Sequence, residues 1–264
     1  MTPEMTAPDL LAAPDSPKVD VLAPSPNFGP RKAAVDMLVL HYTGMAGADA
    51  AIALLKEPGS QVSCHYLVRE DGTVVQMVAE AARAWHAGIS AWEGVTDTNS
   101  RSIGIEIANG GHDFGLPDYP DAQIAAVIAL CADIIARHAI RADRVLAHSD
   151  VAPARKSDPG EKFPWPRLHA AGIGHLVPEA QSEGGRFLML GDAGQPVAAL
   201  KAMLALYGYD IALHDAYDAQ TQQVVAAFQR HFRPSRVDGV ADAATILTLR
   251  ALIASRPQDA PPTA

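Results

Sequence analysis

Two histidines and one aspartate are spaced so that they could hold a metal ion. His41 follows the apolar run 35–40, His148 follows the apolar run 145–147, and Asp158 comes ten residues after the second histidine. Two imidazoles and a carboxylate are an accepted ligand set for catalytic zinc, which keeps a fourth position for water. Strands far apart in sequence can be neighbours in a sheet, so the long gap between the histidines is no objection. The alternative is that both histidines only hydrogen-bond at strand ends and that Asp158 caps a turn.

The elements that must position these residues alternate between strands and helices. Asp-Gly at 71–72 lies between two β-rich runs, which predicts a hairpin. Asp121 is expected to cap a long helix whose apolar positions follow helical spacing. The ends of strands on a rigid sheet are where α/β proteins usually display chemistry. Strands are predicted at 35–40, 62–69, 73–77, 102–108 and 145–147, and helices at 48–55 and 121–138.

The chain divides into three parts by composition. Residues 1–30 are rich in proline and small residues, and we expect them to be a loose N-terminal arm. A first domain should cover residues 31–180, and its end, from about 170 to 185, reads as a linker. A small helical module should follow at residues 186–255. Its three helices are predicted at 196–207, 219–231 and 241–254.

Composition excludes several classes of protein. The chain of 264 residues has a net charge of −9 and no basic block, so nucleic acid is not an expected partner. The longest apolar stretch, 124–140, is interrupted by charged residues, and no transmembrane segment is expected. Two cysteines without a Cys-x-x-Cys spacing do not support a disulfide framework. The N-terminal sequence does not resemble a secretory peptide, which predicts a cytoplasmic protein, with the periplasm or envelope as the alternative if a leader was removed.

Five motifs in order resemble a known enzyme family. They are His41-Tyr42-Thr43, Cys64-His65-Tyr66-Leu67-Val68, Trp85-His86-Ala87-Gly88, Ile103-Gly104-Ile105-Glu106 and the stretch from His148 to Gly160. Together they resemble the zinc-dependent N-acetylmuramoyl-L-alanine amidases of the AmpD and AmiD type (Amidase_2), over about residues 20–170. The resemblance implies an α/β fold with a mixed β-sheet flanked by helices. It also implies one Zn²⁺ per chain and cleavage of the amide that joins muramic acid to L-alanine.

The same resemblance assigns roles to single residues. It makes His41, His148 and Asp158 the zinc ligands, Glu106 the general acid/base and Lys156 the stabiliser of the oxyanion. The chemistry is reasonable, because a carboxylate can move a proton from water to a departing amine and a cation opposes the charge of a tetrahedral intermediate. Glu106 could instead be a solvated strand residue, and Lys156 an ordinary surface charge. Substrate contacts are expected from Tyr42, Trp85 and His86.

The C-terminal part has a resemblance of its own. Ala-Phe-Gln at 227–229 and Asp-Gly at 238–239 lie among predicted helices. This pattern, over about residues 190–255, is similar to the three-helix peptidoglycan-binding module found beside cell-wall hydrolases. Both parts therefore imply peptidoglycan or muropeptides as the partner. If the module only binds polymer, removing residues after about 180 should spare the hydrolysis of small soluble muropeptides.

Two other functions fit parts of the pattern. A peptidoglycan-recognition protein on the same fold would bind muropeptides without cutting them, but its non-catalytic members typically lose the third ligand, which is present here as Asp158. A zinc peptidase that cuts within the stem peptide fits the metal ligands but not the ordered motifs. The sequence does not distinguish anhydro from ordinary muramic acid as the preferred substrate.

Overall fold

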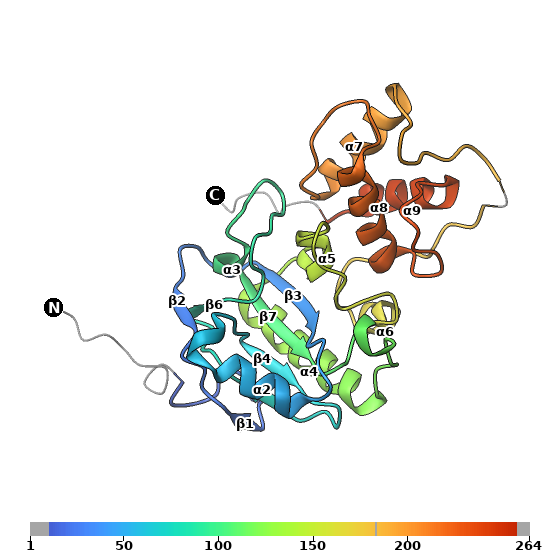
Figure 1. Cartoon of the computed structure of the whole chain (residues 1–264). Coiled ribbons are helices and arrows are strands. Elements are labelled where there is room, and N and C mark those ends of the chain that lie inside the picture. Colours follow the sequence, from blue (N-terminus) through green and yellow to red (C-terminus); the bar gives the residue numbers. More distant parts are fainter. Residues whose placement is uncertain (1–10, 183, 258–264) are drawn as a thin grey trace, which may run out of the picture.

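A mixed sheet forms the centre of the N-terminal part of the molecule (Figure 1). The structure, a computed structural model, describes residues 11–182 and 184–257. Within these ranges the main sheet has six strands in the order β1-β5-β4-β7-β3-β8, all neighbours parallel except the predicted hairpin β4–β5. This confirms the expected α/β class. The strands are β1 (Val21–Leu22), β3 (Met37–Tyr42), β4 (Tyr66–Val68), β5 (Val74–Gln76), β7 (Ser102–Ile107) and β8 (Val145–Ala147).

Helices cover both faces of this sheet. Successive side chains of a strand point to opposite faces, and β3 shows the consequence. Leu38 and Leu40 pack in one cluster with α4 (Asp121–His138), whereas Met37 and Val39 pack in another cluster with the C-terminal helices. The helix α2 (Ala48–Lys56) covers the neighbouring part of that second face, over β4 and β5.

The same alternation places the predicted site residues. His41 follows Met37 and Val39 at intervals of two, so it lies on the face of the sheet that meets the C-terminal helices. On the adjacent strand β7, Ile105 and Ile107 pack with α4, and Glu106 between them projects to the opposite face. His41 and Glu106 are paired in register. The acid and the first histidine are therefore neighbours near the carboxyl ends of two parallel strands.

The C-terminal helices form the helical module, which we define as residues 195–255, that is, α7–α9 with the loops between them. Its helices are α7 (Gln195–Tyr207), α8 (Ala219–Phe232) and α9 (Ala243–Ser255), close to the predicted ranges. Asp218 and Asp242 cap α8 and α9 by accepting hydrogen bonds from backbone N–H groups. The side chain of Gln229 accepts from the N–H of Gly239 and donates to the carbonyl of Val240. The Ala-Phe-Gln and Asp-Gly elements thus hold the fold of the module itself.

The helical module shares a core with the sheet instead of standing apart from it. Met37, Val39, Leu146 and Val151 pack in one buried cluster with residues of α7, α8 and α9, and Trp92 lies fully buried in the same cluster. Figure 1 shows α5 (His148–Val151) between the sheet and these helices. Cutting the chain near residue 180 would expose this apolar surface to water. The structure therefore does not support the expectation that the first domain functions unchanged without the module.

The expected loose arm is wrong for the part that the structure describes. Residues 1–10 lie outside the described residues. Beyond them, Leu11 is buried, β1 adds to the main sheet beside β5, and β2 (Phe28–Pro30) pairs with β6 (Ala82–Ala84). The side chain of Asn27 donates hydrogen bonds to the carbonyls of Glu57 and Val62. Backbone pairing and these side-chain contacts supply the order that composition alone did not predict.

Several short elements had no clear signal in the sequence. They are too brief for periodicity to appear. The prediction that Asp121 caps the long helix is off by one position, because Asp121 is the first residue of α4 and Pro120 occupies the capping position. No helix of the described residues combines the length and the apolar character that crossing a membrane requires. The short elements that are not introduced above are α3 (Thr98–Arg101), α6 (Trp165–Ala170) and the 3₁₀ turns Pro58–Ser60, His112–Phe114 and Ala142–Arg144.

Candidate metal and catalytic site

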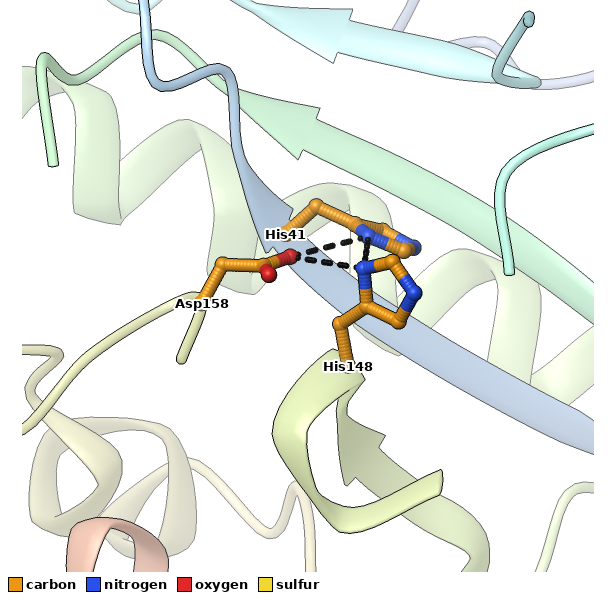
Figure 2. Close-up of side chains that lie close together, drawn as sticks. All are labelled: His41, His148 and Asp158. Atoms are coloured by element: carbon orange, nitrogen blue, oxygen red, sulfur yellow. Dashed lines mark hydrogen bonds and ion pairs between the residues drawn. The ribbon is translucent and has the colours of Figure 1, made fainter. Parts of the chain in front are cut away.

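His41, His148 and Asp158 meet in one buried cluster, as the sequence predicts (Figure 2). The Nδ1 atoms of the two histidines are 2.8 Å apart. Oδ2 of Asp158 lies 3.1 Å from Nδ1 of His41 and 2.9 Å from Nδ1 of His148. The three residues are 1%, 2% and 5% exposed. Figure 2 shows the ligand atoms pointing toward one another from three separate segments of the chain.

Each ligand comes from a different kind of element. His41 lies in β3, near its carboxyl end, and His148 is the first residue of α5, directly after β8. Asp158 lies in the irregular loop that follows, where its backbone carbonyl accepts a hydrogen bond from the N–H of Ser149 at 3.0 Å. This bond ties the loop to the start of α5, so Asp158 and His148 are held together.

A chain of hydrogen bonds fixes which nitrogen of His41 carries the proton. The hydroxyl of Ser102 donates to the carbonyl of Thr98 at 2.7 Å, so its oxygen accepts from Nε2 of His86 at 3.0 Å. His86 then has a free lone pair on Nδ1, which accepts from Nε2 of His41 at 3.0 Å. Nδ1 of His41 is left without a hydrogen and faces the other two ligand atoms.

His148 is oriented in the same way by the backbone. Its Nε2 donates to the carbonyl of Ala87 at 3.1 Å, so Nδ1 is the ring nitrogen that faces the cluster. The guanidinium of Arg155 donates to the same carbonyl and also, at 2.8 Å, to the carbonyl of Ile89. Arg155 thus holds the loop that carries the acceptor for His148.

The protonation state suits a divalent cation. Burial, and then the proximity of His148, lower the pKa of His41 to about 4, so the imidazole is neutral near pH 7. Burial acts to raise the pKa of Asp158, but the neighbouring His148 and His41 outweigh it and hold that pKa below its ordinary value. Two imidazole nitrogens and one carboxylate oxygen converge here, which is the donor chemistry of a zinc site. The residues present fit a metal ion.

Glu106 lies beside this cluster with an unsatisfied carboxyl oxygen. Its Oε2 is buried and has no hydrogen-bond partner among the described residues. Burial, and then the negative charge of Asp158, raise the pKa of Glu106 well above its ordinary value, while Lys156 acts in the opposite direction. A carboxyl group of this kind readily holds a proton and passes it on.

A cavity of about 520 Å³ opens over the cluster and brings the other predicted residues together. Glu106, Lys156, Tyr42, Trp85 and His86 all contribute to its lining, along with His148 and Asp158. Both ring nitrogens of His86 are engaged by protein groups, so it lines the cavity without a free nitrogen to offer a substrate. Its position requires glycine on the next strand, since a Cβ at Gly104 would lie 2.4 Å from the His86 ring.

Sequence reasoning missed three contributors to this site. Ser102 and Arg155 act through hydrogen bonds to residues distant in sequence, so no local pattern reveals them. His112 lines the cavity, where its Nδ1 lies 3.0 Å from the hydroxyl of Tyr42 and its Nε2 lies 3.0 Å from a carboxylate oxygen of Glu161. The only signal for His112 was its residue type, which ten histidines of the chain share.

Comparison with known families gives two matches along the chain. The family described as N-acetylmuramoyl-L-alanine amidase matches residues 31–161. The family described as a peptidoglycan binding domain matches residues 193–249, within the segment that contains the helical module.

Individual relatives extend the likeness over most of the chain. N-acetylmuramoyl-L-alanine amidase AmiD of Escherichia coli is 43% identical over 240 residues, which cover 85% of this chain and 84% of the relative. The structure of E. coli AmiD with the substrate anhydro-N-acetylmuramic acid-L-Ala-D-gamma-Glu-L-Lys has a TM-score of 0.73 at 40% identity and covers 86% of this chain and 93% of that one. AmpDh3 of Pseudomonas aeruginosa in complex with an anhydromuramic pentapeptide has a TM-score of 0.70 at 32% identity, covering 85% and 93%.

Proposed function

The chain belongs to the family of N-acetylmuramoyl-L-alanine amidases, and from this premise we propose that a zinc ion held by His41, His148 and Asp158 serves its hydrolytic reaction. The bond cleaved is the amide between N-acetylmuramic acid and L-alanine in peptidoglycan or muropeptides. The observation that carries the proposal is the convergence of three ligand atoms, 2.8 to 3.1 Å apart, beneath the cavity that Glu106 lines.

The zinc site takes one ion per chain in this proposal. When bound, the ion would polarise the amide carbonyl and acidify a water molecule. The protein prepares the site by keeping the His41 imidazole neutral and by directing the Nε2–H groups of His41 and His148 to His86 and to the carbonyl of Ala87. Partners of this kind orient the ligands and strengthen their basicity.

Glu106 moves the proton. Its carboxylate takes a proton from the attacking water as the new C–O bond forms, and it returns that proton to the nitrogen of L-alanine as the C–N bond breaks. The products are the lactyl carboxylate of muramic acid and a stem peptide with a free amine. The raised pKa of Glu106 favours the protonated form that the second step needs.

The remaining cavity residues bind and position the substrate. Lys156, which lines the cavity beside Asp158, opposes the negative charge that develops on the amide oxygen. Trp85 and Tyr42 offer aromatic faces at the cavity wall for the sugar or the stem peptide. His86 acts on His41 and leaves no ring nitrogen for the substrate.

The division of labour follows the two family matches. Residues 31–180 form the amidase domain in this proposal, and residues 186–255 bind peptidoglycan. A domain that binds polymer favours action in the periplasm or envelope over the cytoplasm. Fractionation of cells followed by immunodetection of the protein distinguishes the two compartments.

Hydrolysis with and without metal tests the proposal. A purified muropeptide is incubated with the protein as prepared, after chelation, and after zinc is added back, and the products are identified by mass spectrometry. We expect a free stem peptide that begins at L-alanine, lost on chelation and restored by zinc. An intact muropeptide despite bound zinc would point to a recognition protein, and cuts within the stem would point to a peptidase.

A further inference from the structure

A buried polar cluster joins the helical module to the segment that carries His148. Its centre is Asp150, which is 0% exposed. Oδ2 of Asp150 accepts hydrogen bonds from Nδ1 of His231, at 2.6 Å, and from the N–H of Ala147, at 2.8 Å. Oδ1 accepts from the hydroxyl of Tyr209 at 2.7 Å. Two of the three donors to this carboxylate therefore come from the C-terminal part of the chain.

Asp150 controls the geometry at His148 because both lie in the four-residue helix α5. Ala147 occupies the capping position, His148 is the first helical residue, and the carboxylate of Asp150 reaches back to the N–H of Ala147. A bond of this type stabilises the first turn of a helix and fixes the direction of its side chains. The position of Asp150 thus determines how His148 enters the metal cluster.

The two donors from the C-terminal part are themselves held rigidly. The ring of His231 stacks between Trp165 and Phe232, with ring centroids 3.7 and 3.8 Å away. Tyr209 is 2% exposed and packs edge-on against Trp92, with ring centroids 5.0 Å apart. Neither side chain has room to leave Asp150 for another partner while the module is docked.

The apolar contacts around α5 follow the same arrangement. Leu146, just before the helix, and Val151, its last residue, both lie in the cluster that contains the core of the module. A buried carboxylate is costly unless donors satisfy it. Without Tyr209 and His231, the carboxylate of Asp150 would rotate toward water, and the conformation of α5 from His148 onward would change with it.

We propose that the helical module positions the metal ligand His148, through hydrogen bonds from Tyr209 and His231 to Asp150. The module is then part of the metal site as well as a binder of polymer. Tyr209 and His231 are positioning residues and do not contact the substrate. The inference rests on the proposed zinc site, and it adds that affinity for the metal depends on residues outside the matched amidase domain.

The decisive comparison uses two tyrosines of the C-terminal part in the full-length protein. Tyr209→Phe removes only the hydroxyl that reaches Asp150. Tyr217→Phe is the matched control, because Tyr217 is 1% exposed and its hydroxyl donates to the carbonyl of Gly239, at 2.8 Å, inside the C-terminal part. Affinity for zinc is measured by competition with a fluorescent chelator, and folding is monitored by circular dichroism.

We expect Tyr209→Phe to weaken zinc binding by about 10-fold or more, as is typical when a group that orients a metal ligand is lost. Tyr217→Phe should bind zinc as the wild type does, even if its melting temperature falls. In the zinc-saturated enzyme, Tyr209→Phe should lower kcat more than it changes KM. A role in stability alone would affect both tyrosine variants alike and leave zinc affinity unchanged.

A second pair tests the histidine by rescue. His231→Leu and His231→Asn have similar size and both lose the stacked ring, but the amide of asparagine keeps an N–H near the position of Nδ1. Weak zinc binding in the leucine variant and near-normal binding in the asparagine variant would support the proposal.

If Tyr209→Phe and a folded His231→Leu both bind zinc like the wild type, the positioning role is wrong while the amidase proposal stands. A wild-type protein that binds no zinc would overturn the zinc site itself, and this inference with it. Tyr209→Phe loses a single oxygen, so it decides the question even if His231→Leu does not fold.

Discussion

The same substitution, glutamate to glutamine, should change stability in opposite directions at Glu106 and at Glu80. Glu106 has a buried oxygen with no partner within the described part of the chain, and its pKa is raised by burial and by Asp158. Glu80 is also buried, but it accepts hydrogen bonds from Arg137 and Tyr66. Although burial opposes the change, these bonds lower the pKa of Glu80 to about 2. The folded protein disfavours the charged form of Glu106 and favours the charged form of Glu80.

The sign follows from proton linkage. A raised pKa in the folded state means that stability is full below the ordinary pKa of a carboxyl and is lost as the pH rises through the folded pKa, so Glu106 lowers the stability of the protein at high pH. Glu106→Gln removes the ionisable carboxyl and with it this loss, so the variant should be more stable than the wild type at pH 8. For Glu80, the shift from 4.5 to about 2 corresponds to about 3 kcal/mol of stability above pH 4.5, lost as the pH falls through about 2. Glu80→Gln forfeits that contribution.

Thermal unfolding of the metal-free proteins at pH 8 measures both effects. At about 2–4 °C per kcal/mol for a chain of this size, the melting temperature should rise in Glu106→Gln and fall in Glu80→Gln. With zinc restored, Glu106→Gln should bind the metal but lose about 10²- to 10⁴-fold in kcat on a muropeptide. A fall in stability for both variants would refute the claim that the folded protein disfavours the charged form of Glu106. Normal turnover in Glu106→Gln would refute its role in proton transfer.

Three further changes test other parts of the structure. His86→Leu should weaken zinc binding by about 10- to 100-fold, whereas His86→Asn, which keeps an acceptor near Nδ1, should lose less; equal affinities in a chelator competition would contradict the orienting role. Gly104→Ala should reduce zinc affinity and activity because its Cβ would collide with the His86 ring, and an unchanged affinity would show that the ring can move without consequence. A protein that ends at residue 182 should be unfolded or insoluble, since the module covers Met37 and Val39; a native circular dichroism spectrum with full activity on soluble muropeptides would show that the shared core is dispensable.

The three residues of the proposed metal site could be named from the sequence, because the two histidines have local signals and the ordered motifs resemble the amidase family. His41 and His148 each terminate an apolar run, and strand ends of a parallel sheet meet on one edge. The helices of the C-terminal part were also predictable, since each is long enough to show periodicity and two of them begin at a capping aspartate. Local patterns were sufficient to predict those elements whose structure depends on residues within about 15 positions along the chain.

The remaining features depend on contacts that sequence patterns do not encode. The aromatic and glycine neighbours of His86 predicted a substrate contact, whereas its hydrogen bond to Ser102, 16 residues along the chain on β7, had no signal in the sequence. Residues 11–30 read as a loose arm because their composition is rich in proline, yet β1 gains order by pairing with β5. A strand of two residues is too short to show the alternation of side chains that marks a longer strand.

The alternation of one strand explains why the domain interface and the active site lie on the same face. On β3, Leu38 and Leu40 point to α4, so Met37, Val39 and His41 must point the other way. The first two of these are covered by the helical module, and the third, near the end of the strand, lies in the buried cluster with His148 and Asp158 beneath the cavity. The module therefore cannot be docked against β3 without bordering the metal site. In the proposed division of labour, peptidoglycan bound by the module would lie on the same side of the sheet as the proposed metal site.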